Sequence, residues 1–284
     1  MANIKLFVCC HQSIAVPKHP LLVPIQVGAA LAGSYFPGFL YDDTGENISL
    51  KNRSYCELTA QYWAWKNVDA DYYGFFHYRR YLYPDINAKR PYRIERKPSL
   101  PLLDRLGYAW FAELISQYDM ILPKGENMYV PVREHYANAP FHHRRDLELA
   151  EQIVRESSPA YAPAMETYFS HTSCYFGNIF IMRKLTFHNY CTWLFPILEE
   201  FDRRADTSGY AAQARRVDGY LAERLLGVYR THHLDWKTLE LPRVHFEPRR
   251  NKCLQAQILY SFLPPGTRWR SSWKKWVKRI LKTI

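Results

Sequence analysis

The chain has 284 residues, of which 48% are hydrophobic and 16% aromatic, so it can bury one sizeable core. Its net charge of +11 is unevenly placed: residues 249–284 carry ten Lys or Arg and no acidic residue, whereas residues 1–248 carry 28 basic and 27 acidic side chains. A nearly neutral body does not fit a nucleic-acid-binding protein, in which basic residues gather on one face of the fold. We therefore expect no nucleic-acid partner.

Cysteine usage and hydropathy indicate a cellular compartment. The six cysteines form no C-x-x-C pair, so we expect buried thiols in a reducing compartment rather than disulfides or a zinc site. The start MANIKLFVCCH does not fit a signal peptide, and no apolar run reaches the ~18–20 residues of a spanning helix. We expect a cytoplasmic protein.

The first quarter of the chain predicts a strand, a loop and a helix. Residues 4–10 are apolar apart from Lys5 and predict a buried strand, with His11 at its end. Ser54 and Glu57 match a capping box, which predicts a helix over residues 54–67. Between them a loop is predicted by three closely spaced prolines, Pro17, Pro20 and Pro24.

Strands and helices alternate through the rest of the chain. The Pro- and Arg-rich residues 84–101 predict a mobile loop. This alternation predicts an α/β fold, a mixed sheet flanked by helices, with ligands bound beyond the carboxyl ends of the strands. The predicted strands are residues 72–76, 119–123 and 174–182, and the predicted helices are residues 102–117, 146–155, 187–204 and 216–229.

The C-terminal tail, residues 249–284, predicts a basic amphipathic helix appended to a first domain, residues 1–248. Basic residues fill the face opposite an apolar stripe, a pattern typical of helices that lie in an anionic membrane interface. We expect residues 267–284 to bind an anionic membrane surface; a helix docked on the parent fold or on a partner protein is the alternative. The apolar stripe comprises Trp269, Trp273, Trp276, Val277, Ile280, Leu281 and Ile284.

Two polar segments near the predicted strands are candidates for binding a ligand. Asp42, Asp43 and Asn47 can bind a base or ribose, or can form a turn that leads into the next helix. Arg79 and Arg80 follow His77 at the end of a predicted central strand, where arginines bind a diphosphate. Strand alternation would aim only one of the two arginines at the ligand unless the chain turns there, and a salt bridge to the preceding helix is the alternative role.

Two later segments carry candidate acceptor and catalytic residues. His142 and His143 precede a helix and are candidates for sugar contact, although a polar helix start explains them equally well. Adjacent histidines without a third ligand do not predict a metal site. Asp218 and Glu223 lie five positions apart on a predicted helix, so one of them can act as the base that a displacement at a sugar requires.

Several segments taken together resemble a bacterial family long described as a domain of unknown function and found in capsule, exopolysaccharide and O-antigen gene clusters. Members of that family are recognised as galactofuranosyltransferases. The resemblance covers residues 4–248 and is carried by PIQVGAALAG, DDTGENISLKN, YCELTAQYWAWKN, YYGFFHYRRYL, HHRRDLELA, CYFGNIFIMRK and GYLAERLLGVY.

The resemblance implies a GT-A-like fold with a Rossmann-type sheet and a UDP-galactofuranose donor at its carboxyl edge. It also implies inversion at the anomeric carbon and an acceptor glycan on a lipid carrier, as in O-antigen or capsule synthesis. By position in GT-A enzymes, uridine contacts fall to His11 and residues 42–47. The diphosphate falls to His77, Arg79 and Arg80, which take the place of the usual metal-binding Asp-x-Asp. The donor sugar falls to Gly177 and Asn178.

The same positional analogy makes Glu223 the first candidate for the catalytic base and Asp218 the second. No metal ligand and no cofactor is predicted, while a divalent cation, Mg²⁺ or Mn²⁺, is left open, as are the acceptor, the linkage and the oligomeric state. Two alternatives remain: a transferase for another UDP-hexose such as UDP-galactopyranose, and a non-catalytic glycan-binding or scaffold subunit. We expect a peripheral protein at the inner face of the cell membrane.

Overall fold

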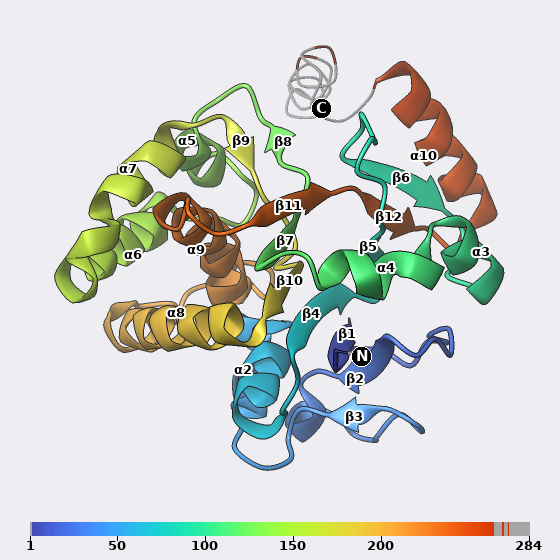
Figure 1. Ribbon diagram of the computed structural model, residues 1–284. Helices are drawn as coiled ribbons and strands as arrows, with labels where there is room; N and C mark the ends of the chain where they lie inside the picture. The colour runs from blue at the N-terminus through green and yellow to red at the C-terminus, as the bar shows by residue number, and fades with distance from the viewer. Residues whose placement is uncertain (1, 264–268, 270–271, 273–284) are drawn as a thin grey trace.

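The computed structural model describes residues 2–263, 269 and 272. Within these residues, ten strands form one mixed sheet, with the order β11-β7-β10-β4-β1-β2-β3 along its main path; β12 pairs with β5 and β6 and extends the sheet beyond β4 (Figure 1). These ten strands are β1 Ile4–Cys10, β2 Leu22–Gln26, β3 Leu40–Tyr41, β4 Tyr72–His77, β5 Arg80–Leu82, β6 Tyr92–Glu95, β7 Met120–Pro123, β10 Phe180–Arg183, β11 Thr238–Leu241 and β12 Arg243–Phe246.

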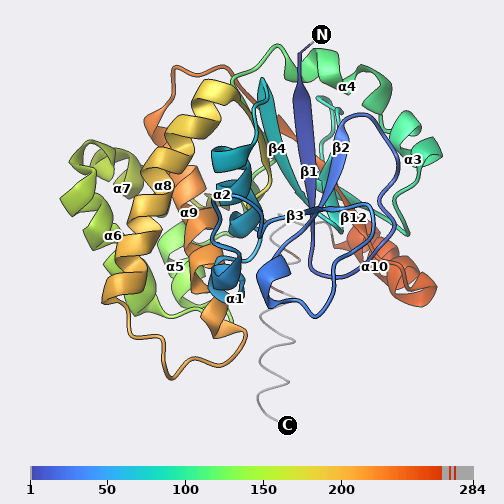
Figure 2. The ribbon, with the colours of Figure 1, turned by 90° about the horizontal axis from the view of Figure 1, so that it is seen from below.

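Helices cover both faces of the sheet, as the view from below shows (Figure 2). On one side lie α2, α6, α7, α8 and α9, and on the other lie α3 and α4. The described helices are α1 Asn52–Tyr55, α2 Leu58–Asn67, α3 Leu100–Arg105, α4 Tyr108–Ile115, α5 Val132–Ala137, α6 Arg144–Ser157, α7 Ala162–Ser170, α8 Lys184–Arg204, α9 Val217–His232 and α10 Arg250–Phe262.

Side-chain alternation along β1 explains why the core has two halves. Phe7 and Cys9 point into the cluster beneath α2, α8 and α9, whereas Leu6 and Val8 point into the cluster beneath α3 and α4. Successive residues of a strand face opposite sides of the sheet, so a strand that is covered on both faces is apolar throughout. This arrangement confirms the predicted buried strand over residues 4–10 and the predicted α/β class.

The loop predicted from the three prolines is wrong at Pro24, which lies inside β2 between β1 and β3. Along a strand between two neighbours, the residues whose backbone groups bond to one neighbour alternate with those that bond to the other. Leu21 and Val27 bond to β1. Pro24 lies an odd number of positions from both, so its nitrogen points toward β3. On that side β3 pairs only with Ile25 and Gln26. The imide nitrogen therefore displaces no ladder hydrogen bond, and the proline is tolerated.

Two further predictions are corrected by the structure. Residues 84–101 are not only a loop, because they contain β6, which pairs in parallel with β12. The helix predicted over residues 102–117 is two helices, α3 and α4, separated at Gly107, whose φ is 86°. The pairing of β6 depends on β12, which lies far away in the sequence, whereas the break between α3 and α4 has a local signal in Gly107.

The basic tail predicted over residues 267–284 lies outside the described residues, apart from Trp269 and Ser272. The side chain of Trp269 is 80% exposed. Within the described residues, α10 occupies the beginning of the segment predicted as the tail and lies beside β6 (Figure 1). All six cysteines are free thiols, five of them buried.

Candidate functional site

Two histidines lie together at the carboxyl edge of the sheet. Parallel pairing places Cys9 opposite His77, so His11, just after β1, and His77, at the end of β4, leave the sheet side by side. Their ring centroids are 6.4 Å apart, and both rings contact Tyr78. Burial, together with the nearby Arg80, lowers the pKa of His77 to about 2. Its Nδ1 accepts a backbone N–H at 3.2 Å, so the neutral ring carries its proton on Nε2 and can donate it to a ligand.

Two arginines follow at the same edge. The chain turns at Tyr78 and Arg79 and returns as β5, in which Arg80 pairs with His77. On a continuing strand, Arg79 and Arg80 would point to opposite faces of the sheet. Because the chain turns here, that rule does not apply to the pair. Within the described residues neither arginine has an ion-pair partner, unlike the buried Arg243, which pairs with a carboxylate. Arginines without counter-ions at a sheet edge can bind an anion such as a diphosphate.

The strand predicted over residues 174–182 is broken, and the break forms part of the site. It consists of β9, Ser173–Cys174, which pairs with β8, Glu126–Asn127, and of β10. Between them Gly177 and Asn178 have φ values of 93° and 49°, which an extended strand cannot contain. A Cβ added at Gly177 would lie 3.5 Å from Nη1 of Arg80. The loop therefore passes directly alongside this guanidinium.

The capping box predicted at Ser54 and Glu57 does not form. Instead the Ser54 hydroxyl donates to Asp218, and the chain bends at Cys56, whose φ of 52° and ψ of −127° separate α1 from α2. Arg216 holds this bend, because its Nε donates to Cys56 Sγ at 3.1 Å. Strained backbone at a non-glycine residue often occurs where a neighbouring side chain must be aimed.

The residue aimed by this bend is Glu57, which sequence reasoning assigned only to helix capping. Its Oε1 accepts a hydrogen bond from Asn178 Nδ2 at 3.0 Å, and Asn178 also donates to a backbone carbonyl of α9 at 3.0 Å. Burial raises the pKa of Glu57, and the nearby charge of Glu223 acts in the same direction. A carboxylate with a raised pKa, close to the charges of Arg80 and Arg216, has the properties of a general base.

Glu223, the first sequence candidate for the base, lies at the same site with both of its oxygens engaged. Oε1 accepts the backbone N–H of Gly177 at 2.7 Å, and Oε2 accepts from Arg224 at 2.9 Å. The Arg224 side chain is 2% exposed and lies 5.3 Å from the ring centre of Phe176. Glu223 thus neutralises a buried cation and anchors the loop that carries Gly177 and Asn178.

Asp218, the second candidate, is buried beneath α1. Its carboxylate accepts the Ser54 hydroxyl, and the residue is 0% exposed. Burial raises the pKa of Asp218, and the charge of Asp202 raises it further. A carboxylate enclosed in this way cannot contact an acceptor hydroxyl in this arrangement.

The segment with Asp42, Asp43 and Asn47 forms a self-contained loop. Asp42 is fully buried and accepts the backbone N–H groups of Gly28 and Ala29 at 2.8 and 2.9 Å. Asp43 accepts from a tyrosine hydroxyl, and Asn47 bonds to the backbone of its own turn. These bonds favour the turn interpretation for Asp42 and Asn47, while Asp43 keeps one oxygen without a partner among the described residues.

The structure separates the two histidines that precede α6. His142 stacks on Tyr220, with ring centroids 4.1 Å apart, and Tyr220 lies three residues before Glu223 on the same side of α9. His143 is exposed and lies against Tyr210, which donates to the buried Asp146. Only His142 therefore approaches the site. We call its members the strand-end site: His11, Glu57, His77, Arg79, Arg80, His142, Gly177, Asn178 and Glu223.

Two features are absent from the residues that the structure describes. No group of three or more His, Cys, Asp or Glu side chains among them is arranged to hold a metal ion. No helix among them has the length and apolar character needed to cross a membrane.

Comparison with known proteins gives two matches. Residues 5–234 match the model of the family described as "Domain of unknown function (DUF4422)". A solved structure of WbbM, described as a bifunctional glycosyltransferase in its apo form, superimposes with a TM-score of 0.81 at 32% identity, over 86% of this chain and 45% of that one. The chain thus spans less than half the length of WbbM. No curated protein matches the chain.

Proposed function

The chain belongs to the DUF4422 family, and we propose that it is an inverting glycosyltransferase that moves galactofuranose from UDP-galactofuranose to a lipid-linked glycan in bacterial surface polysaccharide synthesis. Support for glycosyl transfer comes from the likeness to WbbM, whose α/β fold this chain shares. Support for the donor comes from the resemblance of residues 4–248 to galactofuranosyltransferases.

The observation that carries the proposal is the pair of arginines, Arg79 and Arg80, at a sheet edge where Arg80 also interacts with Glu57, a carboxylate with a raised pKa. Burial lowers the pKa of Arg80, and the charge of Arg243 acts in the same direction, because both disfavour the charged guanidinium. A bound anion would stabilise that charge in place of the water that burial has removed. A nucleotide-sugar diphosphate supplies such an anion. Parallel strands β1 and β4 end here, which is where open α/β sheets bind nucleotides.

The proposed reaction is a single displacement. A carboxylate takes the proton of an acceptor hydroxyl, the oxygen attacks the anomeric carbon, and the bond to UDP breaks with inversion. Arg79 and Arg80, with the Nε2 proton of His77, stabilise the charge that develops on the leaving diphosphate. The alternative for that task is a divalent cation, Mg²⁺ or Mn²⁺, and chelation with EDTA distinguishes the two.

Glu57 and Glu223 are the two carboxylates available for proton transfer. Both oxygens of Glu223 already accept hydrogen bonds, from Gly177 and Arg224, so neither is free to take a proton from an acceptor hydroxyl. Glu57 accepts one side-chain hydrogen bond, from Asn178, and burial raises its pKa. We therefore assign the base to Glu57 and the positioning of the Gly177–Asn178 loop to Glu223.

Titration calorimetry with UDP tests the binding step without any acceptor. We expect UDP to bind the wild-type protein and to bind Arg80→Ala and Arg79→Ala at least about tenfold more weakly, because a charge-assisted hydrogen bond contributes ~1.5–3 kcal/mol. Arg203→Ala, on the exposed end of α8, is the matched control and should bind as wild type. Absence of UDP binding to the wild-type protein would favour the scaffold alternative.

A further inference from the structure

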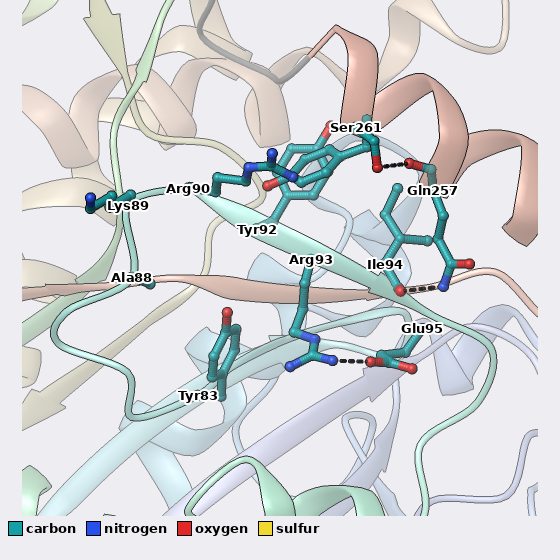
Figure 3. A pocket seen from close by; sticks show the side chains of 11 residues that line it. Tyr83, Ala88, Lys89, Arg90, Tyr92, Arg93, Ile94, Glu95, Gln257 and Ser261 are labelled. Carbon is teal, nitrogen blue, oxygen red and sulfur yellow. Dashed lines mark hydrogen bonds and ion pairs between the residues drawn. The ribbon is translucent and has the colours of Figure 1, made fainter.

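A hollow of about 500 Å³ lies between β6 and α10 (Figure 3). In the sheet, β12 separates β6 from β5, the strand that carries Arg80 of the strand-end site. Three tyrosines line it, and two of them, Tyr92 and Tyr260, contact each other with ring centroids 5.0 Å apart. Gln257 of α10 donates to the backbone of β6 at 2.9 Å and fixes the helix against the strand. The hollow is therefore held open between two elements that are bonded to each other.

The rim of the hollow is strongly basic. The Arg90 guanidinium lies 5.0 Å from the centre of the Tyr260 ring. Lys89 also lines the hollow, and both basic side chains are exposed. Among the described residues, of the basic side chains on this rim and its flanks only Arg93 has an ion-pair partner, Glu95. The set of exposed basic residues comprises Lys89, Arg90, Arg93, Arg96, Lys97, Arg249, Arg250 and Lys252.

The outer face of α10 is apolar, which is unusual for a surface that is also so basic. Leu254, Ile258 and Phe262 are 56%, 49% and 80% exposed, and their spacing of four residues places them on one face of the helix. Gln257 and Ser261 line the hollow. Gln257 lies three positions after Leu254, and Ser261 lies three after Ile258, so each is about one sixth of a turn around the helix from a residue of the stripe. The apolar stripe and the basic hollow are thus neighbouring surfaces.

We propose that the hollow and the apolar stripe form a membrane-docking surface, in which the hollow receives the phosphate headgroup of an anionic lipid and the stripe enters the acyl boundary. The charge of the rim is complementary to such a headgroup, and the tyrosine walls suit the boundary between water and lipid. The stripe supplies the apolar contact that basic side chains alone lack. This surface lies in residues 83–95 and α10, so it is distinct from the tail at residues 267–284.

The surface is also coupled to the site through one strand. Tyr92 stacks on His245 at 4.0 Å, and β12 pairs His245 with Arg80. A lipid headgroup in the hollow would therefore lie close to the proposed donor site. If the proposed transfer holds, this docking presents the site to an acceptor on a lipid carrier; the docking itself requires no transferase activity.

Vesicle co-sedimentation of the full chain tests the proposal without donor or acceptor. The probes are vesicles of phosphatidylcholine with and without phosphatidylglycerol. Each basic side chain near an anionic surface contributes about fivefold, so the double variant Lys89→Glu/Arg90→Glu should bind the anionic vesicles at least ~30-fold more weakly. Arg203→Glu/Arg204→Glu, the same charge change on α8, is the control and should bind no more than a few fold more weakly.

A second variant tests the apolar stripe. Leu254→Ser/Ile258→Ser/Phe262→Ser should lose vesicle binding, whereas Leu234→Ser, at a side chain that is 72% exposed elsewhere, should not. Thermal unfolding confirms that each variant is folded, and Lys89→Gln/Arg90→Gln provides a milder charge change. Wild-type binding by both the charge and the stripe variants, or equal binding of the wild-type chain to vesicles with and without phosphatidylglycerol, would overturn the proposal.

Discussion

Replacing Glu223 by Gln should affect stability more than chemistry, because Glu223 is the ion-pair partner of Arg224, whose side chain is 2% exposed. Removing one partner of a buried ion pair costs ~3–5 kcal/mol. The amide oxygen of Gln still accepts one hydrogen bond, which returns ~1 kcal/mol. We therefore expect Glu223→Gln to lose ~2–4 kcal/mol, which lowers the melting temperature by roughly 5–10 °C for a domain of this size.

Glu57→Gln is the matched variant, because Glu57 is a carboxylate of the same site without an ion-pair partner among the described residues. Burial raises the pKa of Glu57, so a neutral amide removes an unfavourable charge, and the melting temperature should stay the same or rise. Turnover should fall by a factor of ~10²–10⁴ if Glu57 is the base. Thermal unfolding and initial-rate assays are measured on both variants. The reasoning is refuted if Glu223→Gln melts with the wild type, or if Glu57→Gln keeps wild-type turnover.

Two further predictions concern stability. Gly227→Ala should destabilise the fold by about 3 kcal/mol, because the added Cβ would lie 1.9 Å from Cζ of Tyr168. Gly209→Ala, with nothing within 4 Å, should change stability by less than about 1 kcal/mol in urea unfolding, and equal losses would contradict the packing. The raised pKa of Asp218 means that the folded state binds its proton more tightly, so the stability it contributes is present below pH ~4 and is lost as pH rises through about 7. Asp218→Asn should flatten that decline in urea unfolding measured from pH 4 to 8, and an unchanged slope would count against it.

The parts of the fold that the sequence predicted well are those with a local signal. The apolar runs of β1 and β4 have no alternation because both faces are covered, and this pattern is visible in the sequence. The histidines at their ends, His11 just after β1 and His77 as the last residue of β4, therefore lie at the carboxyl edge of the sheet, as predicted from the two strands. The turn that keeps Arg79 and Arg80 together was an explicit condition of the prediction, and β5 fulfils it.

The features that escaped prediction depend on partners distant in sequence. Pro24 is tolerated in β2 because β3 begins only at the position opposite Ile25, and β6 forms because β12 lies alongside. Gly177 and Asn178 break an otherwise apolar run; here the adjacent Gly and Asn are a local turn signal that the single-strand prediction passed over. Glu57 matched a helix cap by spacing, and its direction depends on the strained bend at Cys56.

The roles of the candidate carboxylates also depend on partners that the local sequence does not show. Asp218 and Glu223 were chosen by spacing on one helix, but spacing does not tell which side chain is enclosed. The structure gives Asp218 a buried partner in Ser54 and gives Glu223 a buried cation. Asp42 is likewise occupied by the backbone amides of a preceding loop. These partners lie 13 to 164 residues away, except for the adjacent Arg224.

The most direct test of the central claim is transfer from UDP-galactofuranose, generated in situ from UDP-galactopyranose by a mutase, to synthetic lipid-linked acceptors, with and without EDTA. We predict a β-linked galactofuranosyl product, no product when the mutase is omitted, and turnover that survives EDTA because Arg79 and Arg80 neutralise the diphosphate. Loss of turnover in EDTA, with recovery on adding Mg²⁺ or Mn²⁺, would keep the donor and contradict the role of the arginines. Equal transfer of galactopyranose without the mutase would contradict the donor assignment itself.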